Sequence, residues 1–280
     1  MGNTKLIVVI VLVVLVLGIG FFYVHNNPAP PTTSTSSNNS GNAVGGTGRA
    51  VFAITDAAAN MNSISIVDIT VNKIEAHSQT NGWVTVSSTP QTYDLLQLKK
   101  RGSEVLLADS QLNSGTYDRV RLSVSNVAVI DTSGNSHSAK LPSDQIEITG
   151  GFDVVPNTNE SISFDFITDQ SLHVTGDGQY IFAPIIQLDT KDNATINIGG
   201  DNSIHIIGGS PRDSLKVGMD AAGNIGVGFN ISDAQSLSID SNGKIQIVAS
   251  ASGNLGTNSN GSSSGLVNGV GYSGSYGGGY

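Results

Sequence analysis

The chain of 280 residues contains no cysteine and few charged residues, and each shortage excludes particular kinds of site or partner. Without cysteine there can be no disulfide, no thiolate metal site and no lipid-modified cysteine. Acidic residues occur only between Asp56 and Asp240, and basic residues other than Lys5 occur only between Arg49 and Lys244. The two ends are therefore different in kind from the middle, which alone is expected to fold.

Basic residues are scarce relative to acidic ones. The chain has 22 Asp and Glu residues against 13 Lys and Arg residues, for a net charge of −9. Binding to phosphate backbones and to anionic lipid requires clustered Lys and Arg. The composition therefore argues against a nucleic-acid partner.

The longest apolar run is residues 6–24, LIVVIVLVVLVLGIGFFYV. As a helix its 19 residues would span about 28 Å, close to the hydrocarbon thickness of a bilayer. A cleaved signal peptide is the competing interpretation, but its apolar region is usually shorter. The sequence predicts a transmembrane signal anchor over residues 1–25, with the membrane as a partner through residues 6–24. Lys5 lies on the short flank, so the N-terminus is expected in the cytoplasm and the bulk outside the cell, as a single-pass membrane protein.

Two low-complexity segments flank the middle of the chain. Residues 26–48 are rich in Pro, Thr, Ser, Asn and Gly, which indicates a disordered stalk. Residues 252–280 form a Gly, Ser, Asn and Tyr tail without a charged side chain. The stalk is not expected to bury enough surface to fold, and the tail is expected to be either disordered or sticky.

Between these segments the hydrophobic period is two residues, and β-branched residues dominate the run from Ile64 to Ile74. Short strands separated by clusters of Gly, Pro, Asn, Asp and Ser are typical of a sandwich or a barrel. The prediction is an all-β fold: an antiparallel β-sandwich over residues 49–192 and a β-hairpin-rich extension over residues 193–251, preceded by the single N-terminal transmembrane helix. One or two helical turns are expected around residues 94–100.

Seven pieces of the middle segment carry a family resemblance. They are AITDAA (53–58), GW (82–83), YDLLQL (93–98), LNSGTYDRVRLSV (112–124), LPS (141–143), SFDF (163–166) with Ser171, and YIFAPII (180–186). In this order they resemble the surface-domain family catalogued as domain of unknown function 4382, over residues 49–192. The resemblance implies an exported prokaryotic β-sandwich without established catalytic or binding residues. The family usually has proline where this chain has Ala58.

Local patterns assign roles to several residues. Tyr117 follows a flexible Gly at a strand start, which predicts a packed ring with a capped hydroxyl. Arg119 and Arg121 share one strand face, Asp118 is expected on the other, and Arg121 is expected to pair with a carboxylate across strands. Three turns of the form Asp-x-x-Gly are expected to close hairpins, since Asp accepts a backbone hydrogen bond and Gly takes the left-handed position; they start at Asp131, Asp220 and Asp240.

The stretch 53–77 holds Asp56, Glu75 and His77, which raises the question of a catalytic site. General acid–base catalysis needs two titratable groups that converge on a pocket. Glu75 and His77 lie on one parity of a strand, so the stretch is interpreted as an edge or solvent-facing strand, with Asp56 capping the turn before it. The histidines are isolated in the sequence, at His25, His77, His137, His173 and His205.

No catalytic, cofactor-binding or metal-binding residue is predicted, and no cofactor. Calcium is the open alternative, because several loops contain aspartate: Asp56, Asp131, Asp165, Asp169, Asp189 and Asp192. Five Asn-x-Ser/Thr sequons without proline at x are candidate glycosylation sites: Asn38, Asn159, Asn193, Asn230 and Asn260.

The sequence thus predicts a membrane-anchored extracellular module with a non-catalytic binding, adhesion or structural role at the cell surface. Its partner would be an unidentified surface ligand or protein. A pilin-like filament subunit is the alternative, since pilins also join an apolar N-terminal helix to a β-sandwich. Prolines 28, 30 and 31 weigh against it, because they would stop the helix soon after the membrane.

Overall fold

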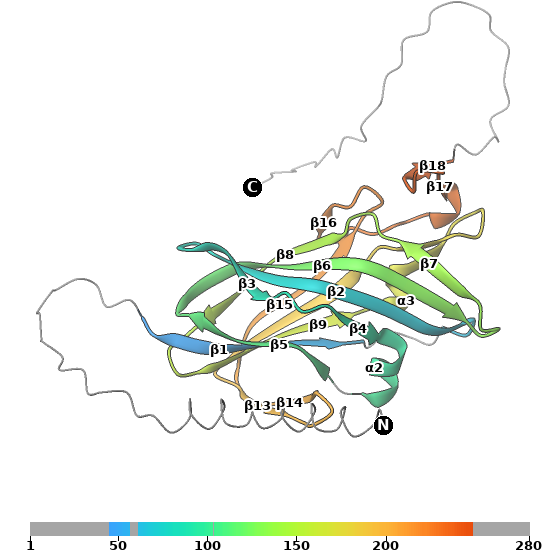
Figure 1. Cartoon of the computed structure of the whole chain (residues 1–280). Coiled ribbons are helices and arrows are strands. Elements are labelled where there is room, and N and C mark those ends of the chain that lie inside the picture. Colours follow the sequence, from blue (N-terminus) through green and yellow to red (C-terminus); the bar gives the residue numbers. More distant parts are fainter. Residues whose placement is uncertain (1–44, 57–60, 103, 249–280) are drawn as a thin grey trace, which may run out of the picture. The chain divides into compact units, whose positions relative to one another are not determined.

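The computed structural model describes residues 45–56, 61–102 and 104–248. Two large sheets make up this part of the chain and lie as two layers (Figure 1). Sheet 1 contains, in spatial order, β13 (Thr195–Ile198), β14 (Ser203–Ile207), β5 (Glu104–Asn113), β1 (Thr47–Thr55), β9 (Asn159–Phe166), β12 (Ile185–Asp192), β15 (Ser210–Met219) and β16 (Ile225–Gly226). The prediction of an all-β fold is confirmed.

Sheet 2 faces sheet 1. Its spatial order is β10 (Leu172–Val174), β11 (Tyr180–Phe182), β7 (Ser136–Lys140), β6 (Gly115–Asp131), β2 (Ile64–Ser78) and β3 (Gly82–Ser87). Two further strands join it, β4 (Gln91–Asp94) beside β2 and β8 (Gln145–Val154) beside β6. A separate pair is formed by β17 (Leu237–Ile239) and β18 (Ile245–Ile247).

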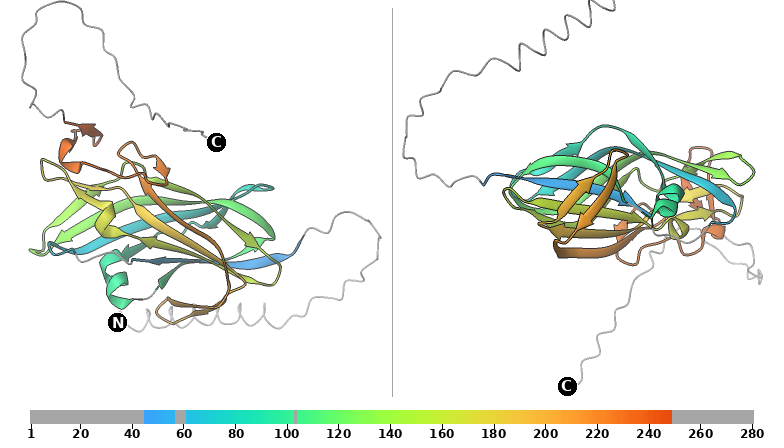
Figure 2. Two further views of the ribbon diagram at one scale, coloured as in Figure 1. Left: turned by 180° about the vertical axis from the view of Figure 1, so that it is seen from behind. Right: turned by 90° about the horizontal axis from the view of Figure 1, so that it is seen from below.

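The pairing is mixed, so the prediction of purely antiparallel sheets is wrong. β1 runs parallel to β9, and β11 runs parallel to β7. Alternation of apolar residues fixes which face of a strand is buried but not the direction of its neighbour. Strands β13 to β16, which come from the predicted extension, add to sheet 1, as the view from behind in Figure 2 also shows.

One core fills the space between the sheets. Phe52 of sheet 1 meets Phe152 of sheet 2 edge to face, with ring centroids 5.9 Å apart. Tyr117 stacks on the same Phe152 ring at 5.0 Å, and its hydroxyl donates to the Asn113 carbonyl at 3.1 Å. Tyr117 is 1% exposed, so the predicted packing and capping role is confirmed.

A second, smaller core lies on the other face of sheet 1. Val51 and Ala53 point outward from β1 and meet Ala194, Ile196 and Ile204 at the hairpin β13–β14. All five are buried. The hairpin therefore folds over the outer face of sheet 1 in addition to pairing with the edge of β5.

Helices are few in the described part of the chain. Helix α2 (Leu95–Arg101) begins at Asp94, whose carboxylate accepts from the Gln97 backbone N–H at 3.2 Å, and ends at Gly102 in the left-handed conformation, which confirms the predicted helical turns. The others are α3 (Thr168–Ser171) and η1 (Ala234–Ser236). No helix in the described ranges combines the length and the apolar character that a bilayer crossing requires. Residues 6–24, the stalk up to residue 44 and the tail lie outside these ranges.

The three Asp-x-x-Gly turns are formed as predicted. Gly134, Gly223 and Gly243 have φ of 87°, 87° and 75°, and each Asp carboxylate accepts backbone N–H bonds two and four residues later. The residue after the glycine, asparagine or lysine, supplies the second of these donors. The turn chemistry is local, which is why the sequence alone predicts it.

Candidate functional site

The solvent-facing side of sheet 2 gathers five of the charged or titratable residues that the sequence analysis singled out: Glu75, His77, Asp118, Arg119 and Arg121. Four strands, β3, β2, β6 and β8, place them in two rows by their register. In the first row Trp83 stands opposite His77, and His77 opposite Arg119; in the second, Glu75 stands opposite Arg121, and Arg121 opposite Glu147. We call this set the tryptophan face: Lys73, Glu75, His77, Trp83, Asp118, Arg119, Arg121 and Glu147.

β2 is an interior strand, so the expectation of an edge at Glu75 and His77 is wrong, while the expectation of a solvent-facing side holds for His77. β6 flanks β2 on one side, and β3 and β4 flank it on the other. The side chain of His77 is 20% exposed, whereas that of Glu75 is only 10% exposed. Glu75 is covered because strands β3 and β6 pair with β2 on either side of it.

Glu75 is the centre of the charge network. Its Oε1 accepts from Lys73 Nζ at 2.6 Å, and its Oε2 accepts from Arg121 Nη2 and Nε at 2.7 and 3.0 Å. Burial alone would raise the pKa of this carboxyl, but the hydrogen bonds and charges of Lys73 and Arg121 outweigh burial and lower it. The carboxylate is therefore charged at neutral pH, and the predicted cross-strand pairing of Arg121 is confirmed.

Trp83, the one tryptophan of the chain, packs against these cations. The Arg121 guanidinium lies 4.0 Å from the centroid of the indole, and that of Arg119 lies 5.3 Å away. The His77 ring meets the indole at its edge, 5.2 Å between centroids. Cation–π contacts of this kind contribute about 0.5–1 kcal/mol each at exposed sites. The indole is thus fixed in place while its residue stays partly exposed.

Asp118 lies on this same face, which corrects the expectation that it points the other way. Its Oδ1 is 2.6 Å from His77 Nδ1 and 3.7 Å from Arg119 Nε. The pairing of β6 shifts register between Tyr117 and Arg119, and such a bulge breaks strict alternation. The hydrogen bond with His77 is the main reason why the pKa of Asp118 is lowered.

The tryptophan face presents fixed aromatic and charged side chains. Glu75 and Asp118 have lowered pKa values, so neither is poised to donate a proton near neutral pH. Arg119 bonds to Glu147 at 2.9 Å, which leaves both arginines held by carboxylates. Tryptophan and arginine in fixed positions are the residues most enriched at binding hot spots.

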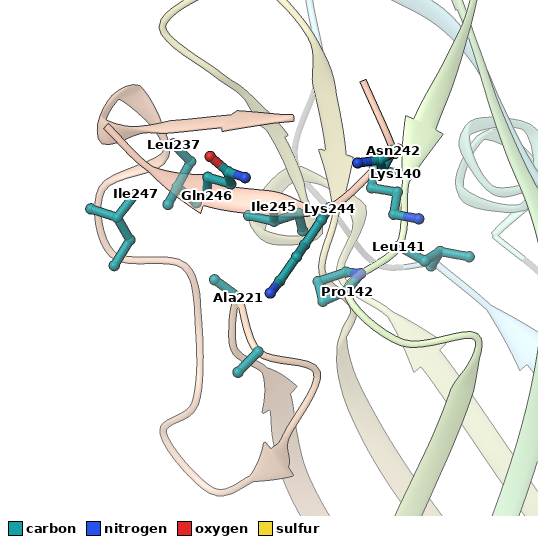
Figure 3. Close-up of a pocket in the computed structure, with 12 residues that line it drawn as sticks. Lys140, Leu141, Pro142, Ala221, Leu237, Asn242, Lys244, Ile245, Gln246 and Ile247 are labelled. Carbon is teal, nitrogen blue, oxygen red and sulfur yellow. The ribbon is translucent and has the colours of Figure 1, made fainter. Parts of the chain in front are cut away.

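The structure also contains an open cavity of about 610 Å³ near the β17–β18 hairpin (Figure 3). Lys140, Leu141 and Pro142 border it from the end of β7, and Ala221 borders it from the β15–β16 turn. Residues 242–247 supply the remaining wall. The sequence does not indicate that the two lysines share a site, because they lie 104 residues apart at positions 140 and 244 and no local pattern connects them.

The sequons occupy different environments. Asn193 and Asn230 are exposed, and Asn193 has a positive φ of 52° in the turn after β12. Asn159 is half-buried, and its Nδ2 donates to the Ala194 carbonyl at 3.4 Å. Asn38 and Asn260 lie outside the described residues.

The aspartates suggested as calcium ligands form no metal-binding group in the described residues. Within residues 45–56, 61–102 and 104–248, no group of three or more His, Asp or Glu side chains is arranged to hold a metal ion. Asp131 instead bonds to its own turn. Asp56 is buried at the end of β1, and the turn that it was expected to cap, residues 57–60, lies outside the described part.

Comparison with known proteins places this fold beside one family. Residues 47–184 match the family described as Domain of unknown function (DUF4382), which confirms the resemblance and extends from β1 to the residue before β12. No curated protein and no solved structure matches the chain. The match includes every residue of the tryptophan face, whereas the cavity is lined mainly by residues beyond position 184.

Proposed function

We propose, for a chain whose residues 47–184 resemble a domain family of unknown function, that it is a membrane-anchored extracellular β-sandwich module with a non-catalytic binding role at the cell surface. The observation that carries this proposal is the tryptophan face. A single indole is held by Arg121 and Arg119 on the solvent side of a broad sheet, and the carboxylates below it fix both arginines. Preorganised anchors of this kind lose little entropy on binding.

The membrane tether is the second part of the proposal and depends on the sequence of residues 6–24. The tether and the stalk would present the tryptophan face to the outside at a distance from the bilayer. Protease added to intact cells should remove the β-rich part and leave a short membrane-bound fragment. Full protection of the β-rich part in intact cells, with digestion after lysis, would contradict the outward orientation.

Binding at the tryptophan face can be tested by site-specific cross-linking on intact cells. A photoreactive residue in place of Thr85, an exposed neighbour in the second row of the face, should give a defined cross-linked product. The product should disappear when Trp83→Ala is added. A photoreactive residue at Thr132, an exposed position in the β6–β7 turn, is the matched control. Equal products from both positions, or a product at Thr85 that survives Trp83→Ala, would contradict a role for this face.

A pilin-like filament subunit remains the alternative proposal. In that case a second copy of the chain would be the partner, and the product at Thr85 would be a cross-linked homo-oligomer. Immunogold labelling of intact cells would then follow filaments instead of a scattered surface distribution.

The exposed sequons fit an extracellular location and can report on it. Because Asn193 is exposed in a turn and Asn159 is half-buried with its amide bonded, we expect Asn193 to carry the glycan in a host that glycosylates its surface proteins. Mass spectrometry of the native protein would show this. An unmodified Asn193 in such a host would contradict the predicted glycosylation.

A further inference from the structure

The open cavity at the β17–β18 hairpin has the dimensions of a small-molecule site. Three segments far apart in the sequence form its walls: residues 140–142, residues 221–222, and the hairpin from Leu237 to Ile247. Its volume of about 610 Å³ falls in the range of ligand pockets, on the order of 300–1,000 Å³.

The inner surface of the cavity is apolar. Leu237 is 5% exposed and belongs to the main core, and Leu141, Ala221 and Ile245 pack against that core. Ile247 remains 81% exposed at the rim. An apolar body that entered the cavity would remove this exposed surface from water, which is favourable.

Two cations border the cavity, and its lining contains no acid. Figure 3 shows Lys244 extending from the hairpin toward Ala221 and Pro142, and Lys140 on the side of β7 with its ammonium pointing in another direction. Among the residues that the structure describes, neither lysine takes part in an ion pair. The bases of the tryptophan face, Lys73, Arg119 and Arg121, are by contrast each paired with a carboxylate.

Two acids close in sequence to the lining residues accept hydrogen bonds in their own turns, and Asp240 also interacts with the charge of Lys244. Asp220 accepts from the backbone N–H groups of Ala222 and Asn224 and from the Asn224 amide. Asp240 accepts from the backbone N–H groups of Asn242 and Lys244 and from Gln246 Nε2. In a protein with a net charge of −9, an apolar hollow bordered by two lysines and no lining acid is complementary to an anion.

We propose that this cavity binds a small amphipathic anion, a molecule with an apolar body and a single carboxylate, sulfonate or phosphate group. The apolar body lies against Leu237, Leu141 and Ile245, and the anionic group pairs with Lys244 and Lys140 at the mouth. This site is independent of the tryptophan face, and it is formed largely by residues outside the family match.

Lysine protection on the full-length protein tests the proposal. Naphthalene-2-sulfonate serves as the probe, and the rate of acetylation at each lysine is followed by peptide mass spectrometry. Lys140 and Lys244 should become protected together along one saturable curve. Lys100, an exposed lysine of α2, is the internal control and should keep its rate.

Two comparisons separate the ionic and the apolar parts of the site. Methyl 2-naphthyl sulfone has the same apolar body without the charge. Its half-saturating concentration for protection of the two lysines should be about tenfold higher, because two exposed ion pairs together correspond to about that factor in affinity. Ile247→Ser should raise the half-saturating concentration without altering the unfolding temperature, since this side chain is 81% exposed.

Three results would overturn the proposal. The first is absence of protection at both lysines, and the second is equal protection at Lys100. The third is protection by the sulfone equal to that by naphthalene-2-sulfonate, which would show that the lysine charges do not contribute to binding.

Discussion

Substitution of Glu75 by Gln should destabilise the protein, and the geometry sets the size of the effect. The change keeps the shape of the side chain but removes the charge that balances Lys73 and Arg121. Removing one partner of a fully buried ion pair costs about 3–5 kcal/mol, whereas an exposed pair contributes about 0–1 kcal/mol. Glu75 is 10% exposed, Arg121 21% and Lys73 39%, so the network lies between these limits. We expect a loss of about 2 kcal/mol, which for a domain of this size lowers the unfolding temperature by about 4–8 °C.

The pH dependence distinguishes this mechanism from a packing defect. The pKa of Glu75 is lowered in the folded protein from its ordinary value of 4.5. Its stabilising contribution is therefore present above pH 4.5 and is lost as the pH falls through the folded pKa. The difference in unfolding free energy between the wild type and Glu75→Gln should have its largest value at pH 7 and should become smaller in acid.

Thermal and urea unfolding followed by circular dichroism at pH 7 and in acid would measure both effects. Glu147→Gln is the matched control, since that side chain is 37% exposed and should lose less than about 1 kcal/mol. Equal stability of the wild type and Glu75→Gln at pH 7 would refute the reasoning. A deficit that persists undiminished in acid would also refute it, because it would show that the lost charge is not the cause.

Three further changes test separate parts of the fold. Tyr117→Phe removes the hydroxyl bond to the Asn113 carbonyl and should cost about 1 kcal/mol in urea unfolding. Gly218→Ala would place a β-carbon 2.0 Å from the Phe229 carbonyl oxygen, and the resulting displacement should cost about 1–3 kcal/mol by thermal unfolding. The pKa of Asp131 is lowered to about 2, chiefly by hydrogen bonds from the Asn135 side chain and backbone, so a carboxyl titration by NMR should show it charged down to that pH. Because its pKa is lowered, its stabilising contribution is present above its ordinary value of 3.8 and is lost as the pH falls toward 2.

Matched controls exist for two of these changes. Tyr180→Phe removes a hydroxyl from a half-buried ring, and Gly200→Ala adds a β-carbon with no atom within 4 Å, so both should leave stability nearly unchanged. Equal losses in a test variant and its control would contradict the assigned contact. A titration midpoint of Asp131 near 3.8 would contradict the turn chemistry.

The features that the sequence predicts correctly are those decided within a few residues. The left-handed glycines at 134, 223 and 243, the helical turns around residues 94–100 and the capped hydroxyl of Tyr117 each depend on neighbours at most four residues away. Turn and cap chemistry acts through local backbone bonds, so its pattern is visible in the chain.

The features that escape prediction depend on which strands become neighbours. Alternation in residues 64–74 indicates a strand but not that β6 covers one flank and β3 with β4 the other. The network at Glu75 requires Arg121, 46 residues away, in register. Asp118 lies on the same face as Arg119 and Arg121 because of a bulge in β6, which the residue pattern does not indicate.

The parallel pairing of β1 with β9 sets the order in which the nascent chain can close its core. Arg49 pairs with Asn159, 110 positions later. At a synthesis rate of about 5–20 residues per second, β9 follows β1 by on the order of 5–20 s. Throughout that time Val51, Phe52 and their neighbours on β1 lack at least one of the two strands that flank them in the finished sheet. A chain that stops before residue 159 would carry an apolar strand with one open edge, a form that chaperones and proteases recognise.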